Sequence, residues 1–240
     1  GIVVSYALIL IYAFWYFRKK DYLFGSVEKK YILEELKYAI PIIALQASIF
    51  AMNASDKFFL SVFTDDENKT VGVYIIACVF ASMVNVLSMA LLQYYFPQLY
   101  STLSQPSPDY KLIRHLFFQY AAIMTAGLIL ALIATPVILK YFINENYHAA
   151  IGYSHWLLIG VYLWAITYFF YSFLLYHKSK RALLWLSLCC IAVSLCSNYF
   201  FIRSGNAHDA AISVCIVYGI VFLICLMFTK KYWTRTFTGG

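Results

Sequence analysis

The sequence predicts an all-α, polytopic membrane protein with about seven transmembrane helices, and three observations support this. Of the 240 residues, 63% are hydrophobic and only 12% are charged, whereas a soluble domain carries roughly a quarter charged residues. Apolar stretches of about 20 residues or more recur along the chain, and each is long enough to cross a bilayer as a helix. Aromatic residues make up 20% of the chain, and many stand near the ends of these stretches, as in interfacial aromatic belts.

The apolar stretches are separated by short polar segments, which we interpret as turns. The expected spans are residues 1–17, 38–63, 71–98, 112–139, 151–176, 182–202 and 210–229. Pro41 is expected in the first turn of the second span, where its missing N–H costs little. Pro97 is expected to close the third span, and Pro136 to kink or stop the fourth. Residues 18–37 form a basic connector that is expected to lie on anionic lipid, and residues 230–240 form a tail.

The basic residues predict the orientation of the chain. Seven spans give two sets of ends, and one set holds 14 of the 18 Lys and Arg residues. By the positive-inside rule this set faces the cytoplasm, which places the C-terminus there. Because the bases lie in loops between spans, the net charge of +7 does not indicate a nucleic-acid partner. The 14 bases are Arg18, Lys19, Lys20, Lys29, Lys30, Lys37, Lys111, Arg114, Lys178, Lys180, Arg181, Lys230, Lys231 and Arg235.

Polar residues inside the second span mark it as the first candidate for a functional site. Gln46, Asn53 and Lys57 fall on one stripe of a helical wheel, with Asp56 at its edge. A polar stripe on a spanning helix must face protein or water, and a charge there is costly. We therefore expect these four residues to line an interior cavity. Lys57 has two other interpretations: it could only compensate Asp56, or its side chain could extend to the interface.

Three amides in other spans are further candidates. Asn85 and Gln93 lie in the third span, and Asn198 lies in the sixth near Ser187 and Ser194. Amides suit sugar hydroxyls, but they equally suit hydrogen bonds between helices. The sequence leaves both interpretations open for each amide.

No motif in the sequence indicates a cofactor or a metal. The six cysteines all fall within apolar runs and lack metal-ligand spacing, so we interpret them as small packing residues. The 240 residues contain no nucleotide-binding loop. The chain begins at Gly1 inside an apolar run, and we expect it to be part of a longer protein.

A series of short elements carries a family resemblance. They are Lys37–Pro41, Asp56-Lys57-Phe58, Val71-Gly72-Val73-Tyr74, Phe96-Pro97-Gln98-Leu99, the basic turn Lys178-Ser179-Lys180 and Asn198. In this order and spacing they resemble the second half of bacterial polysaccharide (O-antigen or repeat-unit) flippases of the multidrug/oligosaccharidyl-lipid/polysaccharide exporter superfamily. The resemblance covers residues 30–230. It is weakest at Gly205–Ala211, where a second glycine is missing and Asp209 appears.

The resemblance implies a transporter built from two helical bundles around a central cavity. Residues 1–17 would be the last helix of the first bundle, and residues 38–229 the whole second bundle. The implied activity, which is not enzymatic, is flipping of an undecaprenyl-diphosphate-linked oligosaccharide across the bacterial inner membrane. The implied partners are that substrate, membrane lipids and the N-terminal half of the same transporter. Lys57 and the cytoplasmic bases would contact phosphates, Asn53, Asn85, Gln93 and Asn198 would contact sugars, and Asp56 would couple an ion gradient.

Two alternatives remain at this stage. One is a membrane polysaccharide polymerase, or an acyl- or glycosyltransferase, which would need a larger extramembrane region or converging catalytic residues. The other is a drug/cation antiporter of the same superfamily, whose cavity would favour acids and aromatics over lysine and amides.

Overall fold

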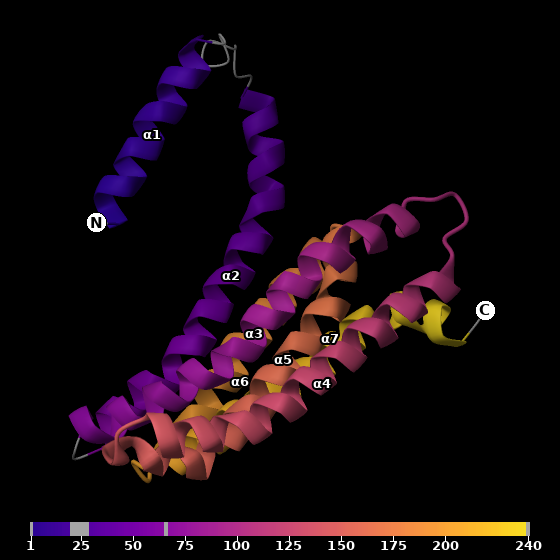
Figure 1. The fold of residues 1–240 in the computed structure, drawn as a ribbon. Helices are drawn as coiled ribbons and strands as arrows, with labels where there is room; N and C mark the ends of the chain where they lie inside the picture. Colours follow the sequence, from indigo (N-terminus) through magenta and orange to yellow (C-terminus); the bar gives the residue numbers. More distant parts are fainter. Residues whose placement is uncertain (1, 20–28, 65–66, 239–240) are drawn as a thin grey trace. The chain divides into compact units, whose positions relative to one another are not determined.

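The computed structural model describes residues 2–19, 29–64 and 67–238. The chain divides into two units, Gly1–Ile40 and Pro41–Gly240, and each is described by itself (Figure 1). All regular structure in the described residues is helical, which confirms the all-α class. The elements are α1 (Ile2–Lys19), α2 (Lys29–Phe63), α3 (Glu67–Leu103), α4 (Tyr110–Phe142), the short 3-10 helix η1 (Glu145–Ala150), α5 (Ile151–Tyr176), α6 (Lys180–Ile202) and α7 (Ala207–Thr238).

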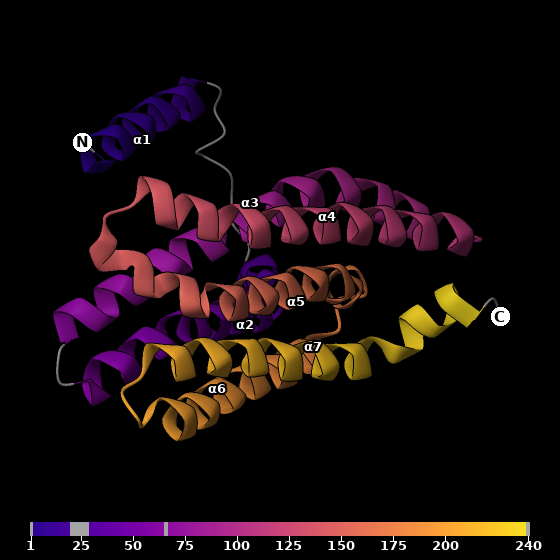
Figure 2. The same ribbon diagram turned by 60° about the horizontal axis from the view of Figure 1, so that its bottom comes forward.

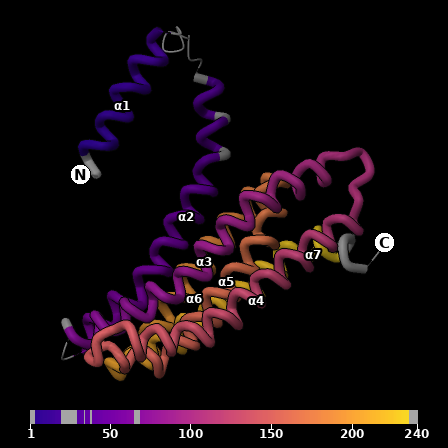
Figure 3. Tube along the Cα trace, viewed as in Figure 1, coloured from indigo at the N-terminus to yellow at the C-terminus, as the bar shows by residue number. Residues whose placement is uncertain are grey.

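Six of the described helices, α2 to α7, are long and apolar enough to cross a membrane. The chain is therefore a multi-span helical membrane protein, as its composition predicts. Figure 3 follows these helices as a continuous trace. Helix α1, which ends on Arg18 and Lys19, is not among the six, so a seventh span at residues 1–17 stays a prediction.

Three prolines lie inside helices, which corrects the first-turn place predicted for Pro41, the helix end predicted at Pro97 and the stop, but not the kink, predicted at Pro136. Helix α2 begins at Lys29, so Pro41 lies in its interior rather than in a first turn, and part of the expected connector is helical. The boundary between the two units falls at this proline. Helix α3 continues past Pro97 to Leu103, and α4 continues past Pro136 to Phe142. Membrane helices tolerate proline because neighbouring groups can satisfy the backbone carbonyl that it leaves free.

Helix α5 is the centre of the unit Pro41–Gly240. It packs against α3 and α4 and also against α7, which in turn packs against α6 (Figure 2). More than half of its side chains are buried, many of them aromatic. Gly160 lets α5 and α7 approach closely, because a Cβ at this position would lie 3.1 Å from Cys215 Cα. The central helix thus contributes Leu157, Val161 and Trp164 to the wall of the cavity described below.

A glycine turn ties the end of α2 to the turn between α6 and α7. Gly205 has φ of +70°, and a Cβ there would lie 2.5 Å from the backbone oxygen of Phe63. Thr64 Oγ1 donates a hydrogen bond of 2.8 Å to Gly205 O. Only glycine fits both the left-handed backbone and this close approach. The contact fixes α2 beside α6 and α7 at this end of the unit.

Candidate substrate-binding site

A cavity of about 350 Å³ lies among α2, α3, α5 and α7. Its polar lining comes from α2 and α3, and its apolar and aromatic lining comes mainly from α5 and α7. The lining residues are Asn53, Asp56, Lys57, Ile75, Cys78, Val79, Ala81, Ser82, Asn85, Leu157, Val161, Trp164, Val214 and Tyr218. The structure thus brings together four of the seven polar residues that the sequence singles out: Asn53, Asp56, Lys57 and Asn85.

Asp56 is the buried anionic centre of this cavity. Its side chain is only 4% exposed, and Tyr74 donates a hydrogen bond of 2.7 Å from its hydroxyl to Asp56 Oδ2. Lys57 Nζ lies 3.1 Å from Oδ1 and 3.3 Å from Oδ2. A carboxylate buried among spanning helices requires such partners, because an isolated charge there is costly.

Lys57 is less buried than Asp56, since its side chain is 36% exposed. Its ammonium also donates to the backbone oxygen of Asn53, at 2.8 Å. The lysine is therefore anchored by one carboxylate and one carbonyl while part of it remains open to the cavity. An ammonium has three donors in total, and a ligand oxygen can replace or join these acceptors.

An amide and two aromatic rings form the wall beside this pair. Tyr218 donates a hydrogen bond of 2.6 Å from its hydroxyl to Asn53 Oδ1, which links α7 to α2. Trp164 of α5 stacks on Tyr218, with ring centroids 5.6 Å apart and an interplanar angle of 22°. Stacking on Trp164 fixes the position and orientation of the Tyr218 phenol. Flat aromatic surfaces next to amides are suited to the apolar faces and hydroxyls of sugar rings.

Asn85 contributes an acceptor without a donor. Its Oδ1 atom is buried, and among the described residues no group donates a hydrogen bond to it. An unpaired buried carbonyl oxygen costs about 1–3 kcal/mol. Since Asn85 lines the cavity, a donor from a bound molecule or from water would remove this cost.

Asn198 lies in a separate cluster. Its Nδ2 donates to Ser55 Oγ at 2.7 Å, and its Oδ1 accepts from Ser213 Oγ at 2.7 Å. Ser55 and Ser194 hydroxyls are 2.7 Å apart. The amide is buried and joins α2, α6 and α7. This geometry favours the helix-to-helix interpretation of Asn198 that the sequence leaves open.

Gln46 and Gln93 lie outside the cavity as well. Both are exposed, Gln46 on α2 and Gln93 on α3. Gln46 is separated from Asp56 by ten residues, or about 15 Å of helix, and Gln93 from Asn85 by eight, or about 12 Å. They share with Asn53 and Ser82 an outward position on the surface of this unit. A polar helix surface of this kind cannot face hydrocarbon without cost.

Sequence reasoning missed the aromatic partners of the site. Tyr74 stands in the Val71–Tyr74 element, but nothing in that element indicates a bond to Asp56. Tyr218 and Trp164 lie in apolar runs and are two of many aromatic residues. The available signal was weak: a charge that must be buried needs a donor nearby, and a phenol on a neighbouring span can supply one.

Comparisons of the chain with protein-family models, with curated proteins and with solved structures find no match. The fold and the cavity define the class: a multi-span helical membrane protein with a polar cavity among its spans. Among the described residues no group of three or more His, Cys, Asp or Glu side chains could hold a metal ion.

Proposed function

We propose that this chain is one helical bundle of a transporter that flips an undecaprenyl-diphosphate-linked oligosaccharide across the bacterial inner membrane. The observation that carries the proposal is the cavity itself. Among spanning helices it combines a buried carboxylate, a partly exposed lysine side chain and an amide oxygen that has no hydrogen-bond partner among the described residues. Helix packing alone gains nothing from leaving an acceptor unpaired, whereas a binding site does.

The chemistry of the cavity fits the parts of such a substrate. A diphosphate and several sugars cannot cross hydrocarbon without being shielded. Lys57 supplies a cation for phosphate oxygens, and Asn53 and Asn85 supply amides for sugar hydroxyls. Tyr218 and Trp164 supply an aromatic surface. At about 350 Å³ the cavity lies at the lower end of the range for small-ligand pockets, so it would hold one part of a larger substrate.

The remainder of the substrate would be enclosed by a second bundle. The outward polar residues Gln46, Asn53, Ser82 and Gln93 support this, because they require protein or water rather than lipid. The partner is the N-terminal half of the same transporter. Rocking of the two bundles would open the cavity to each side of the membrane in turn. Asp56 is the proposed coupling acid for an ion gradient, since it is the buried carboxylate of the cavity.

The proposal includes an orientation, in which the loops with most bases face the cytoplasm. Ser104 and Ser204 are exposed serines in turns that lie on opposite sides of this prediction. In a background without native cysteines, Ser204→Cys should react with a membrane-impermeant maleimide in intact cells, and Ser104→Cys only after permeabilisation. The reverse pattern would invert the topology.

Site-specific photo-crosslinking tests the substrate class. Ser82 lines the cavity and is exposed, whereas Trp185 is exposed on α6 away from it. We expect a photoreactive residue at position 82 to capture an undecaprenyl-diphosphate-linked oligosaccharide in membranes, and one at position 185 to capture bulk phospholipid only. Capture at position 82 that is unchanged when the sugars are absent would argue against the proposal.

A further inference from the structure

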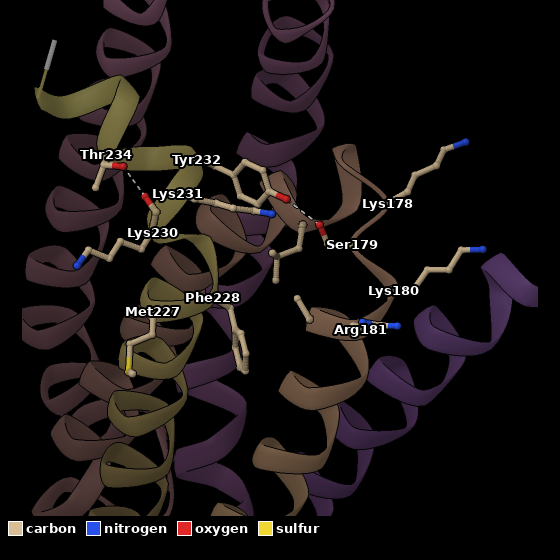
Figure 4. Close-up of a pocket in the computed structure, with 12 residues that line it drawn as sticks. Lys178, Ser179, Lys180, Arg181, Met227, Phe228, Lys230, Lys231, Tyr232 and Thr234 are labelled. Atoms are coloured by element: carbon tan, nitrogen blue, oxygen red, sulfur yellow. Dashed lines mark hydrogen bonds between the residues drawn. The ribbon is translucent and has the colours of Figure 1, made fainter. Parts of the chain in front are cut away.

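A second space lies between the turn joining α5 to α6 and the C-terminal part of α7. Its volume is about 920 Å³. The residues around it form two groups. The end of α5, the turn and the start of α6 contribute Leu174, Lys178, Ser179, Lys180, Arg181 and Ala182, and α7 contributes Met227, Phe228, Lys230, Lys231, Tyr232 and Thr234. Figure 4 shows Lys231 extending from α7 toward Ser179 of the turn, while Lys178 and Lys180 extend outward on the far side of the turn and Lys230 extends outward from α7.

The charge around this space is positive. Five of its lining residues are basic, and none is acidic. Within the described part of the chain, Lys180, Arg181, Lys230 and Lys231 form no ion pair with a carboxylate. Bases that line one space raise its positive potential, which attracts an anion. Among the described residues no carboxylate lies within ion-pair distance of these four bases, so the space is suited to an anionic group of another molecule.

Tyr232 connects the two segments that carry these bases. Its hydroxyl lies 2.8 Å from Ser179 Oγ, and its ring stacks on His177 with centroids 4.1 Å apart at an interplanar angle of 9°. Lys231 Nζ lies 4.6 Å from the centre of the same ring. These contacts join α7 to the turn between α5 and α6, so the two groups of bases are held at opposite sides of one space.

The remaining walls are apolar. Leu174 and Ala182 line one side, Phe228 the other, and Met227 is 76% exposed at the edge. The space thus has a cationic rim next to an apolar surface that continues along the outside of α7. A soluble phosphate would use only the rim. A phospholipid would use both, with its headgroup among the bases and an acyl chain along Met227.

We propose that this space binds the phosphate headgroup of an anionic phospholipid. The site is distinct from the Asp56 cavity, because Tyr218 and Lys231 are thirteen residues apart on α7, or about 20 Å. The proposal does not depend on the transported substrate. It assigns Lys180, Arg181, Lys230 and Lys231 to the phosphate and Met227 and Phe228 to the lipid chain.

The test uses the 240-residue chain purified in a neutral detergent, with lipid binding measured by native mass spectrometry. Dioleoylphosphatidylglycerol is the anionic probe and dioleoylphosphatidylcholine the neutral one. We expect a phosphatidylglycerol adduct that survives a large excess of phosphatidylcholine. The variant Lys180→Gln/Lys230→Gln should bind phosphatidylglycerol at least about tenfold more weakly, since two of the four bases assigned to the phosphate lose their charge.

Two matched variants separate the site from general surface charge. Lys111→Gln/Arg114→Gln removes two exposed bases near the start of α4, outside the space, and should leave binding within about twofold of the wild type. Lys180→Arg/Lys230→Arg keeps the charge and should also retain binding. An equal loss in the α4 variant would overturn the proposal, because it would show a non-specific charge effect.

Inorganic diphosphate distinguishes a lipid site from a site for soluble phosphate. We expect millimolar diphosphate to leave the phosphatidylglycerol adduct largely in place, because it cannot use the apolar wall. Complete displacement by diphosphate would overturn the assignment to lipid. Equal binding of phosphatidylcholine and phosphatidylglycerol by the wild type would overturn the role of the bases.

Discussion

Two polar clusters lie within the same bundle, and they differ in how completely their groups are paired. Around Asn198, both amide atoms bond to serine hydroxyls, and the cluster is buried. Around Asp56, Lys57 is partly exposed and Asn85 Oδ1 has no donor in the described residues. Both clusters contain amides in apolar spans, which the sequence cannot separate. We therefore distinguish helix-joining residues from a candidate site by whether each polar atom has a hydrogen-bond partner, and not by polarity alone.

The largest effect is expected at the Asp56–Lys57 pair. If the pair belongs to a site, Asp56→Asn and Lys57→Met should each lower export in a complementation assay by at least about tenfold while leaving expression and insertion nearly intact. In Asp56→Asn, Tyr74 can still donate to the amide oxygen at position 56. In Lys57→Met, the same phenol still donates to the Asp56 carboxylate, so each variant keeps a partner for the buried group. The two-bundle proposal predicts that residues 1–240 alone do not complement a flippase-deficient strain, so the assay supplies the chain together with the proposed N-terminal half.

The double variant Asp56→Asn/Lys57→Met is the control for this prediction. If the two charges only compensate each other, the single variants should be unstable and the double variant should restore export. If they form a site, the double variant should stay inactive and remain folded. Normal export by the double variant would make this cluster equivalent to the one around Asn198.

A matched pair of amide substitutions tests the comparison directly. Asn198→Leu removes two short hydrogen bonds and leaves Ser55 and Ser213 with fewer partners, so we expect it to destabilise the protein by about 1–2 kcal/mol. Asn85→Leu removes an acceptor that is already unpaired, so stability should change little while export falls. Thermal unfolding in detergent and export in cells would be measured for both. Destabilisation by Asn85→Leu as large as that by Asn198→Leu would remove the distinction between the clusters.

The sequence predicts the fold well because the relevant signals are local. Apolar run length locates the spans, and turn residues such as Gly205 locate the connections. The prolines are the exception: Pro41, Pro97 and Pro136 all lie inside helices, because a membrane helix can satisfy the freed carbonyl in ways that depend on its neighbours. Local sequence does not contain those neighbours.

The sequence predicts only some residues of the candidate site, because the others depend on contacts between distant parts of the chain. Asp56 and Lys57 could be singled out because charge in a span is costly whatever surrounds it. Whether an amide is paired depends on residues far away in the chain: Asn198 meets Ser55, 143 positions earlier, and Asn53 meets Tyr218, 165 positions later. Single-sequence patterns carry no information on such contacts, so Gln46 and Gln93 ranked with Asn85 although they lie outside the cavity.

A smaller effect is expected from Tyr218→Phe, which removes only the bond to Asn53. The ring and its stacking on Trp164 remain, so the loss should be about 1 kcal/mol in unfolding free energy or less. Export should fall only modestly if Asn53 then turns its amide toward the substrate. Tyr199→Phe on α6, an exposed tyrosine outside the cavity, is the control and should change neither quantity. Equal effects of the two substitutions would indicate that the Asn53–Tyr218 bond does not shape the site.

The smallest expected effect is a shift in the pKa of His177, a residue at the end of α5 outside the spans. Partial desolvation of the imidazole, which stacks on Tyr232, and, secondarily, the positive charge of Lys231 lower the pKa of His177 below its ordinary value. The folded state therefore binds this proton less readily than the unfolded chain does. The contribution of His177 to stability is fully present above the ordinary pKa of histidine and is lost as the pH falls through that value to the lowered one. NMR titration of the labelled imidazole, assigned with His177→Gln, should show the lowered pKa, and Lys231→Gln should raise it only partly, since burial is the larger cause. A complete return to the ordinary value in Lys231→Gln would mean that charge alone sets the pKa. The stacked pair of His177 and Tyr232 would then join the turn to α7 without desolvating the imidazole.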